Sequence, residues 1–191
     1  MHQKIAIIGK GNVGTALEDG FVSAGFQVRS AKKGHVAAAV DWADVIFLAV
    51  PFVAIQETVR EIGATANGKI VVDVTNALTP ELQLAIGFST SGAEELQKLL
   101  PHAKVVKSLN TVFAQHMAQG KLKDQRLTVF AAGNDSDARH LVLQIAKALG
   151  FDAVDGGHLQ NARHLEAMGY FTILLGYVLG NGPDIGFKLV R

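Results

Sequence analysis

The chain has 191 residues, of which 49% are hydrophobic and 18% are charged, and its formal net charge is +1. This balance predicts a packed globular protein and gives no sign of the large basic field that nucleic acids or acidic membranes attract. The absence of cysteine excludes disulfides, thiolate metal sites and cysteine nucleophiles. We expect a single domain over residues 1–191, because domains usually contain about 100 to 200 residues.

The N-terminus runs directly into an apolar segment at residues 4–8, without the basic start and small-residue cleavage site of a signal peptide. Residues 165–180 are nearly all apolar but include Glu166, and they are fewer than the roughly 20 residues that a membrane-spanning helix needs. We therefore expect a soluble, cytoplasmic protein without membrane insertion. The apolar segment is expected to be a buried helix or part of a homodimer interface.

Short apolar runs alternate along the chain with segments of helical character. Runs that are apolar on both faces suit strands covered on both sides, as in parallel sheets. The predicted strands are 5–9, about 27–30, 45–50, 70–74, 103–109, 127–133 and about 152–154. The predicted helices are 12–24, 53–65, 93–100, 135–149 and an apolar C-terminal helix with a tail within about 158–191. The alternation predicts an α/β fold with a doubly wound, mostly parallel sheet of the Rossmann type.

Residues 9–14, GKGNVG, have the G-x-G-x-x-G spacing and lie between the first predicted strand and an amphipathic helix. In that setting Gly9 permits the tight turn, Gly11 lets a pyrophosphate approach the backbone, and Gly14 lets the helix pack closely against the strand. The free amides at the positive end of the helix would receive the phosphates. The predicted phosphate-binding residues are Gly9, Gly11, Asn12, Val13 and Gly14. A glycine turn without a ligand is the alternative.

The segment after the second predicted strand indicates which dinucleotide is bound. NAD-binding proteins of this type place Asp or Glu about 20 residues beyond the glycine loop, whereas NADP-binding ones place cations there. No acid lies between Asp19 and Asp41. The strand leads instead into Ser30, Lys32 and Lys33, which can donate a hydrogen bond and supply positive charge to a 2′-phosphate. We therefore expect NADP; two ordinary solvated lysines are the alternative.

Six motifs along the chain are GKGNVGTAL (9–17), LAVPF (48–52), DVTNAL (73–78), VKSLNT (106–111), DGGHLQNARHLE (155–166) and GFKLVR (186–191). With these motifs, the chain resembles the NADPH-dependent coenzyme F420 oxidoreductases, small Rossmann proteins that pass hydride between NADP and a deazaflavin. It is also similar to the cytosolic oxidoreductase domain of the STEAP ferric reductases. One departure is residues 34–44, which are shorter than the helix-containing stretch of the family and predict an abbreviated adenosine pocket.

In open α/β sheets, ligands lie beyond the carboxyl ends of the strands, which makes the loops 49–52, 75–78 and 108–111 the site candidates. The resemblance implies that Ala49, Val50, Pro51 and Phe52 border the ribose and pyrophosphate, that Thr75, Asn76 and Ala77 lie nearer the nicotinamide, and that Asn110 and Thr111 face the reacting rings as catalytic residues. The implied hydride acceptor is a planar small molecule, either coenzyme F420 or a flavin such as FMN or FAD.

Several candidates also have purely structural interpretations. Pro51 can simply end a strand, and Asn76 can serve a turn. Asn110 can cap a helix that begins near Val112. The backbone amides of Gly156 and Gly157 can approach a flat ring, or the two glycines can form only a turn between strand and helix.

The sequence contains no motif for a metal site. The seven histidines show no H-x-x-x-H or H-E-x-x-H spacing, so no metal site is predicted. Arg163 and Glu166 are spaced as an i, i+3 pair on one helix face.

Little sequence follows the last predicted strand, which argues against the large helical second domain of imine and pyrroline-carboxylate reductases. Because hydride transfer leaves no catalytic signature, a non-catalytic NADP-binding redox sensor is the alternative function.

Overall fold

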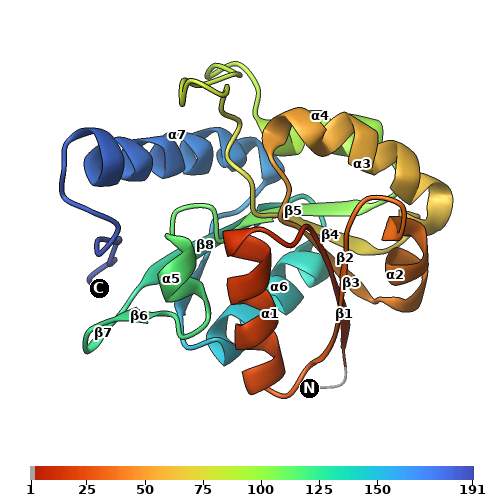
Figure 1. Ribbon diagram of the computed structural model, residues 1–191, viewed down its shortest axis with the longest axis horizontal. Coiled ribbons are helices and arrows are strands. Elements are labelled where there is room, and N and C mark those ends of the chain that lie inside the picture. The colour runs from red at the N-terminus through yellow and green to blue at the C-terminus, as the bar shows by residue number, and fades with distance from the viewer. Residues whose placement is uncertain (1–2) are drawn as a thin grey trace.

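A computed structural model describes residues 3–191 as one large sheet with helices on both faces (Figure 1). The sheet has seven strands in the order β2-β1-β3-β4-β5-β8-β9. All neighbouring strands are parallel except β5 and β8, which are antiparallel. The predicted doubly wound, mostly parallel sheet of the Rossmann type is therefore confirmed.

The elements have the following bounds. The strands are β1 (Lys4–Ile8), β2 (Gln27–Ala31), β3 (Val45–Leu48), β4 (Ile70–Asp73), β5 (Lys104–Ser108), β6 (Lys121–Leu122), β7 (Gln125–Arg126), β8 (Thr128–Gly133) and β9 (Asp152–Asp155). The α-helices are α1 (Asn12–Ser23), α2 (Val36–Trp42), α3 (Ile55–Ile62), α4 (Gly92–Leu99), α5 (Ala114–Met117), α6 (Ser136–Ala148) and α7 (Ala162–Ile173). Short 3₁₀ turns lie at Phe52–Ala54, Gly63–Ala66 and Leu159–Asn161, and a π turn lies at Leu174–Val178.

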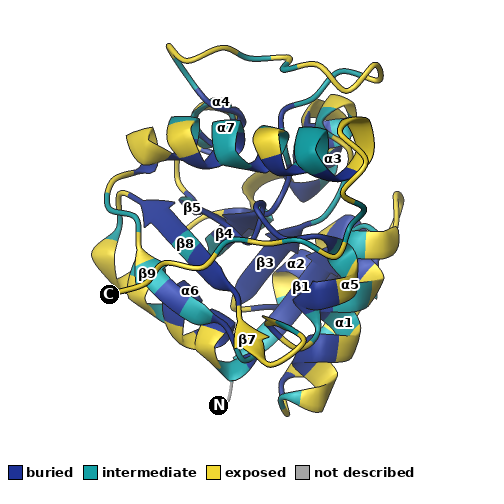
Figure 2. Ribbon diagram, turned by 90° about the vertical axis from the view of Figure 1, so that its left-hand side faces the viewer, coloured by how far each residue is buried: buried dark blue, intermediate teal, exposed yellow. Residues whose placement is uncertain are grey.

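The strands form because their side chains are apolar on both sheet faces. In β1, Ile5 and Ile7 point into one core while Ala6 and Ile8 point into the other. All four are at most 1% exposed. Figure 2 shows the sheet as a buried layer between helices whose outward faces are exposed. Burying one such isoleucine contributes roughly 1.5–3 kcal/mol, which favours a strand that is covered on both sides.

Two groups of helices cover the two faces. Helices α1, α5 and α6 pack on the face where Phe21 contacts Phe47 at 4.7 Å and Phe26 at 5.7 Å between ring centroids. Helices α2, α3 and α4 cover the other face. Helix α7 contacts α4 and β5, so it lies beside α4 near the sheet (Figure 1).

The structure differs from the sequence-based expectation at several elements. The shortened segment 34–44 still forms a helix, α2, because Val36, Ala39 and Val40 recur at helical spacing and pack against the sheet. A helix near Val112 begins only at residue 114, and Phe113, not Asn110, is its N-cap residue, so the capping interpretation of Asn110 is wrong. The small β6–β7 hairpin was not expected.

Within residues 3–191, no helix is both long enough and apolar enough to cross a membrane. The same part of the chain holds no group of three or more His, Cys, Asp or Glu side chains placed to bind a metal ion.

Candidate functional site

The sheet order reverses between β1 and β3. The chain goes from β1 to β2 on one side and then crosses to β3 on the other, which opens a crevice beyond the carboxyl ends of β1 and β3. A cleft of about 350 Å³ lies there. It is lined by Gly11, Asn12, Val13, Ala49, Val50, Pro51, Phe52, Val74, Thr75, Asn76 and Leu78. Three loops that are far apart in the sequence thus meet where the sequence predicted a ligand.

The glycines of the first loop have different surroundings. Gly9 has a φ of +115°, and a Cβ there would lie 2.2 Å from the Ala49 carbonyl oxygen. A Cβ at Gly14 would lie 2.1 Å from the carbonyl oxygen of Gly9. At Gly11, by contrast, a Cβ would have no atom of the described residues within 4 Å, apart from those of Gly11 itself and the residues on either side of it. Gly9 and Gly14 are therefore required by packing, whereas the free space at Gly11 is available to a ligand.

Helix α1 begins inside this cleft. Gly11 precedes its first residue and has no side chain to cap the helix, and the Gly11 carbonyl accepts the first helical bond from the Thr15 amide at 2.9 Å. The amides at the start of a helix have no partner within it. With the positive end of the helix dipole behind them, the amides of Asn12 and Val13 suit a pyrophosphate.

The residues expected at a 2′-phosphate lie at and just beyond the carboxyl end of β2, the strand next to β1. The Ser30 hydroxyl oxygen, on β2, is buried and makes no hydrogen bond with any residue of 3–191. Lys32 is exposed just beyond β2. Lys33 forms an ion pair with Glu57 of α3 at 2.5 Å, and this hydrogen bond and charge raise the pKa of Lys33. A hydroxyl without a partner on β2, with two lysines directly after the strand, is the kind of group set that a phosphate monoester needs. A phosphate bound by Lys33 would compete with Glu57 for it.

At the other end of the cleft, Asn76 and Asn110 bind one another. The Asn76 side-chain amide donates to the Asn110 carbonyl oxygen at 2.9 Å, and the Asn110 amide donates to Asn76 Oδ1 at 2.9 Å and to the Leu165 carbonyl oxygen at 2.7 Å. A Cβ at Gly169 of α7 would lie 2.3 Å from Asn76 Oδ1, so this helix packs directly on the pair. The structure places Asn76 in the cleft lining, whereas Asn110 and Thr111 are buried behind it.

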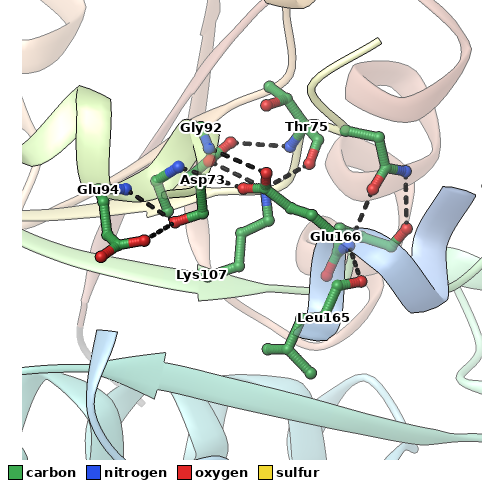
Figure 3. Close-up of polar contacts among 11 residues, drawn as sticks. Asp73, Thr75, Gly92, Glu94, Lys107, Leu165 and Glu166 are labelled. Atoms are coloured by element: carbon green, nitrogen blue, oxygen red, sulfur yellow. Dashed lines mark hydrogen bonds and ion pairs between the residues drawn. The ribbon is translucent and has the colours of Figure 1, made fainter. Parts of the chain in front are cut away.

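A cluster of charged side chains, Lys107, Asp73 and Glu166, lies next to Thr75 (Figure 3). The Lys107 ammonium contacts Asp73 Oδ2 at 2.9 Å and Glu166 Oε1 at 3.0 Å, and it donates to the Thr75 carbonyl oxygen at 2.5 Å. Burial by itself would lower the pKa of Lys107, but the charges of Asp73 and Glu166 outweigh it and raise the pKa above its usual value. The Lys107 ammonium is therefore held in its charged form. Removing one partner of such a buried pair typically destabilises a protein by about 3–5 kcal/mol.

The sequence did not reveal this cluster, because Lys107 was assigned only to an apolar strand. A lysine within an otherwise apolar parallel strand is the one local signal from which a buried ion pair could have been predicted. The i, i+3 pair expected between Arg163 and Glu166 is not formed. Arg163 instead binds Glu94 of α4 through two nitrogens at 2.7 and 2.8 Å, and this hydrogen bond lowers the pKa of Glu94.

The turn after β9 keeps its amides within the protein. The Gly156 amide donates to the Ala131 carbonyl oxygen and the Gly157 amide donates to Asp155 Oδ1, both at 2.8 Å. The geometry favours a strand-to-helix turn over a surface that offers amides to a flat ring.

Comparisons with known proteins show which proteins this chain is similar to. Residues 27–77 match the family model described as NADP oxidoreductase, coenzyme F420-dependent. Metalloreductase STEAP3 of Rattus norvegicus is 31% identical over 180 residues, which cover 86% of this chain and 36% of that protein. The F420-dependent NADP reductase of Methanocaldococcus jannaschii is 27% identical over 135 residues, covering 65% of this chain and 58% of that protein.

The crystal structure of a putative F420-dependent NADP reductase from Arthrobacter sp. FB24 superimposes with a TM-score of 0.91 at 26% identity, covering 99% of this chain and 100% of that one. The chain is thus similar to NADP-dependent oxidoreductases of the F420-dependent and STEAP types, and the resemblance inferred from the motifs is confirmed. It spans little more than a third of the rat relative and just over half of the archaeal one.

The glycine geometry predicts opposite outcomes for two substitutions. In Gly11→Val the side chain enters open space, so the fold should survive while the space needed by the pyrophosphate is filled and NADPH binding is lost. In Gly14→Ala the added methyl group meets the Gly9 carbonyl, so the melting temperature should fall, as expected for overpacking that costs about 1–3 kcal/mol. Titration calorimetry with NADPH and thermal melts of both variants measure this. A Gly11→Val variant with wild-type affinity for NADPH would contradict the assignment of the phosphate loop.

Proposed function

We propose that the protein is an NADPH-dependent oxidoreductase that transfers hydride between NADP and a planar acceptor such as coenzyme F420 or a free flavin. The observation that carries the cofactor part is the fit of the cleft to NADP: open space at Gly11, a helix N-terminus behind it, and the orphaned Ser30 hydroxyl at the 2′-phosphate edge. When bound, the dinucleotide supplies the hydride from its nicotinamide ring. The residues of the chain bind and orient that ring and exclude water.

The surroundings of the cleft support a flat acceptor. A second cavity of about 520 Å³ adjoins the cleft and shares Phe52 and Leu78 with it. Its apolar lining residues include Val53, Ile55, Pro80, Ile86, Leu96 and Leu99. Apolar walls of this size with few polar groups are typical of sites for ring-containing ligands. A planar acceptor can lie against this wall with its reactive edge directed to the cleft.

Asn76 has a defined task in this proposal. Its side-chain oxygen accepts a hydrogen bond from Asn110 and its nitrogen donates to the Asn110 backbone, so the orientation of the amide is set before any ligand arrives. Preorganised groups of this kind hold a reactant in place without losing freedom at the moment of reaction. We propose that Asn76 borders the nicotinamide and that Asn110 and Thr111 support it from behind.

The choice of NADP over NAD rests on Lys32 and Lys33. Replacing both with alanine removes two cations from the 2′-phosphate, so NADPH affinity should fall at least about 10- to 100-fold, since even one lost hydrogen bond to a charged group costs about 1.5–3 kcal/mol. NADH affinity should change little. The pair Lys121→Ala and Lys147→Ala changes the net charge equally at exposed positions away from β2 and should leave both affinities unchanged. Equal losses for NADPH and NADH in the first variant would refute the assignment.

Hydride transfer is tested directly with deuterated cofactor. The protein is mixed with NADPH carrying deuterium at C4 and with coenzyme F420, FMN or FAD in turn. We expect NADPH oxidation that depends on at least one acceptor, with the deuterium recovered in the reduced deazaflavin. Reduced FMN and FAD exchange this hydrogen with water, so for them NADPH loss alone is scored. Tight NADPH binding without oxidation by any of the three would favour a redox-sensing module over an enzyme.

A further inference from the structure

Three charged side chains are withdrawn from water at the nicotinamide end of the cleft. The Lys107 side chain is 0% exposed, and those of Asp73 and Glu166 are 2% and 5% exposed. They come from β5, β4 and α7, which are far apart in the sequence (Figure 3). Because desolvation offsets most of the attraction within a buried ion cluster, apolar residues of the same volume would often stabilise a fold as well. The cluster therefore calls for an explanation other than stability.

The hydrogen bonds of the cluster converge on the backbone of Thr75. Lys107 donates to the Thr75 carbonyl oxygen at 2.5 Å, and Asp73 Oδ1 accepts from the Thr75 amide at 2.9 Å. Both polar backbone groups of a residue that lines the cleft are thus held by charged side chains. An ammonium group has three donors, and Asp73, Glu166 and Thr75 accept from all of them, so the position of Lys107 is fully determined.

Glu166 connects this loop to two helices. It stands on α7, and its carboxylate accepts from the Gly92 amide at 2.9 Å and the Ala93 amide at 3.2 Å at the start of α4. Its chain neighbour Leu165 accepts from Asn110 at 2.7 Å. The carboxylate thereby ties α7, the start of α4 and the Lys107 ammonium to one point.

The contacts close into a ring. Thr75 is followed by Asn76, which binds Asn110; Asn110 binds the backbone of Leu165, next to Glu166. Glu166 binds Lys107, which returns to the Thr75 carbonyl. A displacement of α7 is therefore transmitted to the residues that line the cleft.

We propose that Lys107 and Glu166 are positioning residues for hydride transfer. Through the ring of contacts they fix the Thr75–Asn76 backbone and helix α7 relative to one another, so that the nicotinamide is held at reacting distance from the acceptor. Hydride transfer is sensitive to such alignment, because a misplacement of about 1 Å can slow a reaction on the order of 100-fold. The proposal rests on the proposed function for its kinetic consequence.

The chain offers a matched control. Arg163 of α7 and Glu94 of α4 join the same two helices, but within residues 3–191 neither side chain forms a hydrogen bond or ion pair with the Thr75 loop. Arg163→Met therefore loosens α7 from α4 without touching the ring of contacts. A purely structural role for Glu166 predicts that Glu166→Gln and Arg163→Met behave alike, whereas a positioning role separates them.

The experiment compares Glu166→Gln, Lys107→Met, the double variant Lys107→Met/Glu166→Gln and Arg163→Met with the wild type. Thermal melts, the Kd for NADPH, kcat and KM for the acceptor, and the deuterium isotope effect on kcat are measured. We expect Glu166→Gln to lower kcat at least about 10-fold, with a larger isotope effect and a Kd within about 3-fold of wild type. Arg163→Met should melt earlier but keep the wild-type kcat.

The double variant removes one positive and one negative charge, so it should melt at a higher temperature than Lys107→Met while its kcat stays low. This outcome would separate an effect on kcat from an effect on the melting temperature. If Lys107→Met does not fold, Glu166→Gln still provides the test, because it keeps the shape of the side chain. A wild-type kcat in Glu166→Gln, or an equal loss of kcat in Arg163→Met, would overturn the proposal.

A second readout does not depend on turnover. The fluorescence anisotropy decay of bound NADPH reports how firmly its nicotinamide is held, and it should show a looser ring in Glu166→Gln than in wild type or Arg163→Met. If the wild type oxidises no NADPH, the proposed function fails, and the anisotropy decay still decides whether the cluster positions the ring. Identical decays in all variants would contradict positioning.

Discussion

The site depends on a steric constraint at the end of β1: no Cβ fits at Gly9 or at Gly14. The Gly9 backbone lies against the carbonyl of Ala49, and the start of α1 lies against the carbonyl of Gly9. This close approach brings the first turn of α1 to the carboxyl ends of β1 and β3, where the strand order reverses. The amides of that turn then face open space at Gly11, which is the arrangement that an anion requires.

The two ends of the cleft contain different kinds of chemical group. The phosphate end uses backbone amides, small residues and surface lysines, which bury no charge. The end proposed for the nicotinamide has a buried ion cluster around Lys107 and a reciprocal amide pair, both held against α7. The first arrangement suits binding, since water and phosphate can exchange there. The second suits alignment, because groups with every hydrogen bond satisfied have one favoured position.

Local patterns in the sequence predicted the parts of the structure that depend on local chemistry. The glycine spacing indicated the turn and helix of the phosphate loop, and the apolar runs indicated the strands of the parallel sheet. Contacts between distant segments left no such pattern. Arg163 was paired with its helix neighbour, yet its partner Glu94 is 69 residues away in the sequence. The local sequence places Lys107 in an apolar strand, and its contact with Glu166 of α7 is seen only in the folded structure. The short helix α2 was not predicted, because residues 34–44 are shorter than the helix-containing stretch of the family.

The most direct test of the account is a crystal structure of the protein with NADP⁺. We predict the pyrophosphate on the amides of Asn12 and Val13, the 2′-phosphate hydrogen-bonded to the Ser30 hydroxyl beside Lys32 and Lys33, and the nicotinamide against Thr75 and Asn76. A dinucleotide bound elsewhere, or one that leaves the Ser30 hydroxyl without a partner, would contradict the central claim.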